Sequence, residues 1–302
     1  MRMWSQNLVA LVQYFCPTTF VLTCDENCFD KMATEDVFGA AHTNLAFPDK
    51  IVVMANHQIY ADWVYIWCVA YMAKAHGALK IILKHSLKNL PIYGLRKLAL
   101  DQENIINNLE RTKQSGNPLW LVLFPEGTVI SKDTRKRSKD FAEKNNMNDN
   151  RFTLLPRSTG LRMCLNTLGE TTEWLYDFTI GYPGIKPTEN PEDVYTIRGI
   201  FFLGHYPRNV HVHIRRYHTR DIPTQDAEVF SKWLHERWVE KDKMMDYFYK
   251  HGRFPSGQQL RRVDLPVQLN NSLVDLTQIW ICLLPYVPII KLLSTVYHGL
   301  FG

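Results

Sequence analysis

Residues 51–63 read IVVMANHQIYADW, and this stretch decides the fold of the chain. Ile51–Ala55 is a short, apolar, β-branched run of the kind that forms a strand buried on both faces of a sheet. A polar turn follows it, and an amphipathic helix is predicted from Ala61 onward. His57 is therefore expected at the exit of a buried strand, with Asp62 near the start of the next helix. Ligands of α/β sheets collect at such carboxyl ends of strands.

His57 and Asp62 are five residues apart in the sequence, and a turn between them brings their side chains within reach of each other. A carboxylate bound to one imidazole nitrogen fixes the tautomer and leaves the other nitrogen as a base. This is the arrangement of base and orienting group found in acyl-transfer sites, here without a serine or cysteine between base and substrate. The alternative is a buried histidine that caps a helix beside an ordinary N-terminal aspartate. The pair alone leaves both interpretations open.

A second apolar strand is predicted to run into a polar turn at residues 119–128, LWLVLFPEGT. Gly127 permits a close backbone approach, and Thr128 with the exposed amides of the turn can hold an anionic group. The chain therefore repeats the arrangement of residues 51–63, in which an apolar strand runs into a turn with polar groups that can bind a ligand.

Six segments resemble the glycerolipid acyltransferase family. NHQIYAD (56–62) resembles the family's NHxxxxD block, and FPEGT (124–128) resembles its second diagnostic block at a similar separation. The other matches are LKHSLKNLPIYG (83–94), EGTVISKDTRKRSKDFA (126–142), LLPRSTGL (154–161) and YDFTIGYPG (176–184). Together they are similar to the lysocardiolipin/lysophosphatidylinositol acyltransferase branch in a form typical of fungi. The resemblance covers residues 50–220.

The resemblance implies an acyl-CoA-dependent acyltransferase that acylates the free hydroxyl of a lysophospholipid of the lysophosphatidic acid, lysophosphatidylinositol or lysocardiolipin class. It implies that His57 is the general base and that Asp62 orients and charge-balances it. The implied partners are acyl-CoA, a lysophospholipid and the endoplasmic reticulum membrane; acyl-CoA is a co-substrate, and neither a cofactor nor a metal is implied. The residues expected to hold the acceptor phosphate or to line the acyl groove are Arg96, Glu126, Gly127, Thr128, Pro156 and Arg157.

One block departs from the family pattern. Relatives carry a longer segment after the glycine that matches Gly94, and that segment includes an apolar strand ending in an arginine. This chain reaches Arg96 through Leu95 alone, which spans at most roughly 7 Å. We therefore expect one strand fewer than the family has, an exposed strand edge or apolar patch beside the site, and weak or absent activity. The alternative function is a catalytically impaired lipid-binding or regulatory protein of the same fold, and a soluble hydrolase is a more distant third.

Composition is typical of a globular protein, with 302 residues, 46% hydrophobic and 22% charged. The net charge of +5 suits an anionic membrane surface or a phosphorylated ligand, and no pattern indicates a nucleic-acid reader. The predicted fold is an α/β layered sandwich with a mixed sheet flanked by helices and with hydrophobic, membrane-associating terminal segments. The expected divisions are an N-terminal hydrophobic segment and linker (1–50), an acyltransferase domain (51–250), and a linker with a hydrophobic tail (251–302).

The remaining elements follow from hydrophobic periodicity and from proline and glycine positions. Strands are predicted at 79–83, 174–182 and 209–217, helices at 96–113 and 223–250, and a linker at 251–271. The resemblance of LLPRSTGLRMCLNTL to the family's fourth block implies a short strand before Pro156 and a helix from about Ser158. His211 and His213 lie on one face of their strand by alternation and are interpreted as structural. Cys68 and Cys164 fall within apolar helical patterns and are interpreted as reduced core residues.

Three segments have two interpretations each. Residues 8–24 are apolar. One interpretation is a buried or interfacial segment, and the other is a segment inserted in a membrane. The basic run at 132–139, KDTRKRSK, is either a solvated helix start or a contact for coenzyme A phosphates or lipid headgroups. The tail at 276–296 is preferred as a re-entrant or interfacial membrane segment because two prolines interrupt it, with a helix packed on the core as the alternative.

Overall fold

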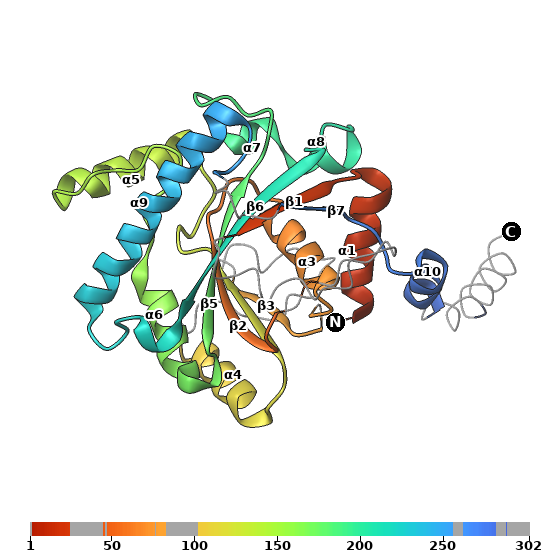
Figure 1. Ribbon diagram of the computed structural model, residues 1–302, viewed down its shortest axis with the longest axis horizontal. Coiled ribbons are helices and arrows are strands. Elements are labelled where there is room, and N and C mark those ends of the chain that lie inside the picture. Colours follow the sequence, from red (N-terminus) through yellow and green to blue (C-terminus); the bar gives the residue numbers. More distant parts are fainter. Residues whose placement is uncertain are drawn as a thin grey trace, which may run out of the picture.

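The computed structural model describes residues 2–24, 45, 47–75, 77–82, 102–255, 262–281 and 288. Within these ranges, seven strands form one mixed sheet that lies between two layers of helices (Figure 1). The strands are β1 (Thr19–Cys24), β2 (Lys50–Ala55), β3 (Leu79–Ile82), β4 (Leu119–Leu123), β5 (Trp174–Gly181), β6 (Asn209–His218) and β7 (Val263–Pro266). The helices are α1 (Arg2–Phe15), α3 (Asp62–Met72), α4 (Gln102–Ser115), α5 (Lys132–Lys144), α6 (Ser158–Leu168), α7 (Pro191–Val194), α8 (Ile197–Phe202), α9 (Ala227–His251) and α10 (Ser272–Ile281). This confirms the predicted layered α/β fold.

The sheet has the strand order β3-β4-β2-β5-β6-β1-β7. The first four strands of this order run parallel to one another, so their carboxyl ends lie at one edge of the sheet. β6 pairs antiparallel with β5, β1 pairs parallel with β6, and β7 pairs antiparallel with β1. The predicted mixed sheet is therefore observed, and β2 lies inside its parallel half.

β2 is buried on both faces, as its uninterrupted apolar sequence predicts. Val52 and Met54 belong to the core that packs under α4, α6 and α9. Ile51, Val53 and Ala55 belong to the other core, which packs under α1 and α3. Because successive side chains point to opposite faces, one short run of residues contributes to both hydrophobic cores. The strand exit is thereby fixed between two packed layers.

The N-terminal apolar segment is split by the structure into a helix and a strand. Residues 8–15 belong to α1, and residues 19–24 form β1, an inner strand between β6 and β7. Thus the buried alternative applies to β1. Among the described residues, no helix is both long enough and apolar enough to cross a bilayer. The predicted tail is described to residue 281, where it forms α10, and at residue 288.

Two expectations about irregular segments are wrong. The stretch 251–271, expected as a linker, contains β7, which pairs with β1 from Val263 to Pro266. The short strand expected before Pro156 is not formed. Side chains, rather than a neighbouring strand, accept the backbone hydrogen bonds here. Ser138 accepts the amide of Leu155 at 3.3 Å, and Asp242 accepts the amides of Phe152 and Thr153.

The basic run at 132–139 forms the first turns of α5, whose N-cap Ser131 exchanges hydrogen bonds with Thr134 in a capping box. Most of its cations are exposed, which fits the solvated-helix interpretation. Arg135 differs from the others because its guanidinium donates to the carbonyls of Asn150 and Thr153 at 2.9 and 2.8 Å. It therefore holds the loop that leads to α6.

The buried histidines and cysteines take structural places. His211 packs edge-on against Phe248, and burial lowers its pKa to about 4. His213 Nδ1 lies 3.0 Å from Thr23 Oγ1 of the neighbouring strand. The structural interpretation of both histidines is therefore confirmed. Cys68 and Cys164 are free and buried in the core, as predicted.

Candidate active site

Two strand exits meet at the carboxyl edge of the parallel half of the sheet. β2 and β4 are adjacent and parallel, and Met54 pairs with Leu123. The polypeptide leaves β2 and β4 within two residues of this pair. The turns 56–61 and 124–128 therefore start side by side. The two sequence blocks identified separately are thus brought to one place by the pairing of their strands.

The predicted pair of His57 and Asp62 forms a hydrogen bond. His57 Nδ1 lies 2.8 Å from Asp62 Oδ2, and the side chains are 13% and 0% exposed. The turn between them is closed by the amide of Asp62, which donates to the carbonyl of Ile59 at 3.1 Å. With Nδ1 engaged, Nε2 is the nitrogen that can face a substrate. The contact expected between the two side chains is therefore observed.

Asp62 receives hydrogen bonds from four donors. Besides His57, the amides of Gln58 and Ile59 donate to Oδ2 at 2.7 and 3.0 Å, and the hydroxyl of Tyr182 donates to Oδ1 at 2.5 Å. A fully buried carboxylate is stable when its oxygens accept several hydrogen bonds. The aspartate is thus not an ordinary exposed residue at a helix start, and its charge is held against the imidazole.

The histidine ring is also held by packing. Phe124, which follows β4, stacks on the ring of His57 with centroids 4.3 Å apart and planes 24° apart. Phe124 is itself buried. The first residue of the FPEGT block therefore fixes the orientation of the imidazole in the other block.

The FPEGT turn is tight and open to solvent at its glycine. Gly127 has a φ of +72° and its amide donates to the carbonyl of Phe124 at 2.9 Å. This backbone conformation favours glycine. The side chain of Arg157 passes close by, because a Cβ on Gly127 would lie 3.9 Å from its Cδ and Nε. Arg157 is exposed and Thr128 is half-buried.

The loop that follows Phe152 places Pro156 and Arg157 beside this turn. The amide of Arg157 donates to the carbonyl of Pro125 at 2.8 Å, Pro156 is buried, and α6 begins at the next residue, Ser158. Of the six residues predicted to bind substrate, Gly127, Thr128, Pro156 and Arg157 are thus brought together around one turn. Arg96 and the shortened block that contains it lie outside the described residues.

Glu126 points inward rather than toward the turn's exposed side. Glu126 is 3% exposed, and its Oε1 accepts a hydrogen bond from the indole N–H of Trp238 on α9 at 3.1 Å. Burial raises the pKa of Glu126 to about 8, although the indole and two backbone amides oppose this shift. Within the described residues, the side chain that donates to this carboxyl is therefore a neutral one on α9. The sequence did not predict this contact.

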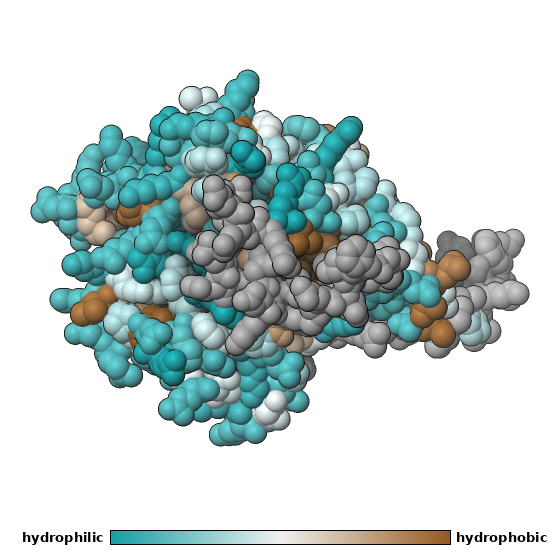
Figure 2. Space-filling model, viewed as in Figure 1, coloured by the Kyte–Doolittle hydropathy of each residue, from teal (hydrophilic) through white to brown (hydrophobic). Residues whose placement is uncertain are grey.

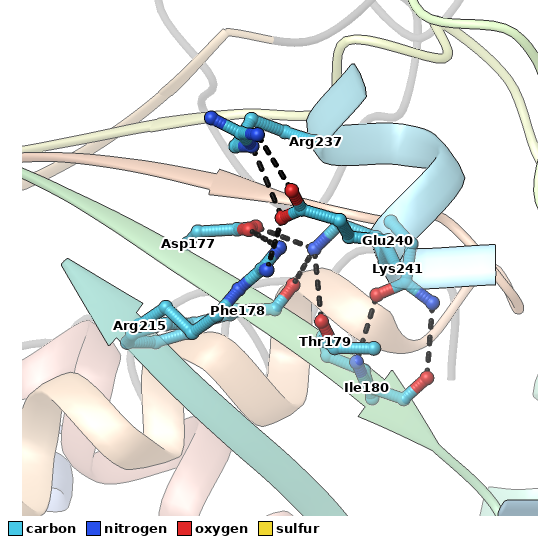
Figure 3. Close-up of polar contacts among 9 residues, drawn as sticks. Asp177, Phe178, Thr179, Ile180, Arg215, Arg237, Glu240 and Lys241 are labelled. Carbon is cyan, nitrogen blue, oxygen red and sulfur yellow. Dashed lines mark hydrogen bonds and ion pairs between the residues drawn. The ribbon is translucent and has the colours of Figure 1, made fainter. Parts of the chain in front are cut away.

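α9 also supplies a buried cation to the neighbouring strand (Figure 3). Lys241 is fully buried, and its Nζ donates to Asp177 Oδ1 at 2.5 Å, to the carbonyl of Phe178 at 2.8 Å and to the hydroxyl of Thr179 at 3.1 Å. Arg215 of β6 binds the other oxygen of Asp177 at 2.6 Å. Burial alone raises the pKa of Asp177, but Lys241 and Arg215 outweigh it and hold that pKa below its usual value.

The network continues from this pair to the surface. Arg215 also binds Glu240 at 2.7 Å, and Glu240 binds Arg237 at 2.5 Å (Figure 3). Glu240 is 42% exposed as a side chain, whereas Asp177 is completely buried. The buried lysine is therefore one end of a chain of alternating charges that links β5 and β6 to α9.

The carboxyl end of β5 is clamped from two sides. Asn56, the first residue after β2, donates to the carbonyl of Ile180 at 3.0 Å and accepts its amide at 2.7 Å. Lys241 binds residues 177–179 of the same strand from α9. β5 therefore ends in a fixed position relative to the turn that carries His57, and Tyr182 follows this end directly.

Four residues of the site were not predicted from the sequence: Asn56, Tyr182, Trp238 and Lys241. Asn56 and Tyr182 lie inside the quoted blocks, so the blocks were recognised but these roles were not. Lys241 falls seven residues after Leu234, on the apolar side of α9, and a lysine at that spacing could have drawn attention. Among the described residues, no group of three or more His, Cys, Asp or Glu side chains could hold a metal ion.

The fold and the site together define a class. A mixed α/β sheet carries a His–Asp dyad in an NHxxxxD turn and an FPEGT turn beside it, which is the arrangement of a glycerolipid acyltransferase. A family model described as Acyltransferase matches residues 41–169, and one described as Acyltransferase C-terminus matches residues 201–277. The second match includes all of α9. The chain belongs to the acyltransferase family.

Its relatives have narrower names. A 2-acyl-1-lysophosphatidylinositol acyltransferase of Saccharomyces cerevisiae is 36% identical, with 83% of this chain and 73% of the relative covered. An uncharacterized acyltransferase of Schizosaccharomyces pombe is 34% identical, with 83% and 74% covered. Lysocardiolipin acyltransferase 1 of Danio rerio is 32% identical, with 67% and 53% covered. The predicted resemblance to this branch is confirmed.

Proposed function

We propose that this acyltransferase moves a fatty acyl group from acyl-CoA to the free hydroxyl of a lysophospholipid. The observation that carries the proposal is the hydrogen bond of 2.8 Å between His57 Nδ1 and the fully buried Asp62. The names of the relatives support a lysophospholipid of the phosphatidylinositol or cardiolipin type as acceptor. The donor is proposed from the same resemblance.

In the proposed reaction, Asp62 fixes the tautomer of His57 and balances the charge that the ring acquires. Nε2 of His57 removes the proton of the acceptor hydroxyl as its oxygen attacks the thioester carbonyl. The tetrahedral intermediate collapses by breaking the carbon–sulfur bond, and the imidazolium returns its proton to the departing sulfur. The acyl group passes directly to the acceptor, so no covalent enzyme intermediate is formed.

The acceptor phosphate is proposed to bind at the FPEGT turn. Arg157 supplies the cation there, while Gly127 and Thr128 supply a close backbone and a hydroxyl. Arg96 is a second candidate cation by family resemblance. Glu126 supports the turn from behind through Trp238 and is not proposed to touch the phosphate.

Both proposed substrates carry acyl chains, so we further propose that the protein works at a membrane, that of the endoplasmic reticulum. Exposed apolar side chains support contact with lipid. On α10, Leu273 and Ile281 are 81% and 52% exposed, and Figure 2 shows hydrophobic surface gathered over this helix. On α8, Phe202 is 79% exposed. Large apolar side chains with this exposure are typical of surfaces that bind lipid or another protein.

The test is turnover by purified protein in detergent with radiolabelled acyl-CoA and a panel of lysophospholipids. Labelled phospholipid from wild-type protein, and none from the His57→Ala variant, supports the proposal. Bound lipid without turnover indicates the impaired lipid-binding protein that the shortened block after Gly94 suggests. Release of fatty acid without dependence on an acceptor indicates a hydrolase. Comparison across the panel also identifies the headgroup.

A further inference from the structure

Tyr182 is joined to the catalytic dyad through Asp62. Its hydroxyl donates to Asp62 Oδ1 at 2.5 Å, while His57 and two backbone amides occupy Oδ2. Among the described donors, Tyr182 is the partner of Oδ1. The three side chains form one hydrogen-bonded series, from imidazole to carboxylate to phenol.

We propose that Tyr182 is a positioning residue of the acyltransferase site, which sets the basicity of His57 by sharing the charge of Asp62. This inference rests on the role proposed above for His57. A donor to Oδ1 withdraws charge from the carboxylate and fixes its rotation, so the other oxygen meets Nδ1 at one angle and with one strength.

The surroundings of Tyr182 hold its hydroxyl in place. The residue is 1% exposed, and its ring packs against those of Tyr65 and Tyr195 with centroids 5.9 and 6.1 Å apart. The hydroxyl of Tyr195 binds the carbonyl of Pro183 at 2.8 Å, which secures the backbone immediately after Tyr182. The strand before it is clamped by Asn56 and by Lys241. Four separate elements therefore fix one phenol.

Burial and the charge of Asp62 raise the pKa of Tyr182 well above its usual value. The hydroxyl consequently keeps its proton throughout the pH range in which the enzyme can work, and it remains a donor. A phenol in this place cannot become a competing base. This agrees with a role in positioning rather than in proton transfer to the substrate.

The chain offers a matched control in Tyr65. It is equally buried, at 1% exposed, and lies in the same aromatic cluster, but its hydroxyl makes no hydrogen bond to Asp62. Tyr182→Phe and Tyr65→Phe each remove one buried hydroxyl from this cluster. Only the first variant removes a donor to the dyad.

The first experiment compares the pH dependence of turnover in wild type and the two variants. Tyr182→Phe should lower kcat by roughly tenfold with little change in either KM, because the Asp62 carboxylate loses the donor that fixes its rotation, and a hydrogen bond to a charged group is worth about that factor. The carboxylate then holds the imidazolium more strongly, so the acidic limb of the pH–rate profile should move to higher pH. Within the described part of the chain, the other carboxyls that act on His57 are those of Glu192 and Glu126, and both are the same in wild type and the two variants. Tyr65→Phe should leave the profile unchanged. An unmoved profile in Tyr182→Phe overturns the proposal.

The second experiment does not need turnover. The proton on His57 Nδ1 gives a strongly downfield NMR resonance when it is shared with a carboxylate, and His57→Gln identifies that resonance by its disappearance. Tyr182→Phe should move it further downfield, because a carboxylate with one donor fewer is a stronger acceptor. An unmoved resonance overturns the proposal. If wild type makes no product with any acceptor, the proposed function fails, while this measurement still decides the role of Tyr182.

A double variant separates positioning from folding. In an Asp62→Asn background the phenol no longer shares a carboxylate charge, so adding Tyr182→Phe should lower the residual rate by much less than tenfold. Equal losses in both backgrounds, accompanied by the same fall in melting temperature, would show that the tyrosine acts only on stability.

Discussion

Trp238 donates its indole N–H to Glu126 Oε1 at 3.1 Å, and this contact joins α9 to the turn of the FPEGT block. Both side chains are buried, and they lie more than a hundred residues apart in the sequence. α9 belongs to the part of the chain matched by the C-terminal family model. The acidic residue of the FPEGT block is thus a structural partner of α9.

Glu126→Gln should change how stability depends on pH. The pKa of Glu126 is raised from 4.5 to about 8 in the folded protein, so between these values the folded state binds more protons than the unfolded state. The unfolding free energy of wild type therefore contains a contribution that is present below pH 4.5 and is lost as pH rises through 8. Glutamine keeps the oxygen that accepts from Trp238 and lacks this contribution.

Urea unfolding at pH 5 and at pH 8.5 measures the effect. The unfolding free energy of Glu126→Gln relative to wild type should increase from the lower to the higher pH. A constant difference would mean that the carboxyl is ionised in the folded state. The acceptor KM of this variant should stay close to wild type if Glu126 does not bind the phosphate.

His57→Ala should reduce turnover by roughly 10²–10⁴-fold, the usual range for the loss of a general base. Turnover by the Asp62→Asn variant should also fall steeply, because an amide cannot balance the positive charge on the imidazole ring. His218→Ala is the matched control. His218 pairs with Trp174 at the start of β5, at the opposite edge of the sheet from the dyad. Wild-type turnover by a folded His57→Ala protein would rule out the mechanism.

Arg157→Ala should raise the KM for the lysophospholipid by about tenfold, the usual order for a lost contact between charged groups. The KM for acyl-CoA should change much less, because the cation is proposed to bind the acceptor phosphate. Arg220→Ala is the control, since Arg220 is 75% exposed and lies in the segment that follows β6. If Arg157→Ala changes both KM values equally, Arg157 has no dedicated role toward the acceptor.

Lys241→Met should destabilise the fold by about 3–5 kcal/mol, because it leaves Asp177 buried with Arg215 as its remaining cation. Lys250→Ala on the same helix removes an exposed pair with Asp246 and should cost about 0.5 kcal/mol or less. Chemical unfolding of both variants measures the contrast. Similar losses in the two variants would show that the buried pair contributes no more than a surface pair.

The strands of the parallel half could be predicted because they are short apolar runs, and because β2 and β4 run into segments with recognisable chemistry. The dyad was predictable for the same reason, since His57 and Asp62 lie within one turn of the chain. β1 and β7 were missed because an apolar run beside a proline, and a short strand in a polar stretch, have no local pattern that reveals a distant partner.

The contacts of α9 were missed for a related reason. Periodicity identified its apolar side but could not show that Trp238 meets Glu126 or that Lys241 meets Asp177. Such pairings depend on how helix and sheet pack, and the sequence contains them only as a lysine at an apolar position. Tyr182 lies in a recognised block, yet its partner is 120 residues away.

β1 is synthesised early, but it pairs with strands that are synthesised late. Its first residue, Thr19, pairs with Asn209, so the ribosome must add about 190 residues before the partner strand exists. At about 5–20 residues per second this takes on the order of ten seconds or more. During that time the apolar segment lacks both of its partner strands, β6 and β7, and contacts of such long range close slowly. Whatever meets the nascent chain first, a chaperone or a lipid surface, therefore has an opportunity to hold this segment before β6 does.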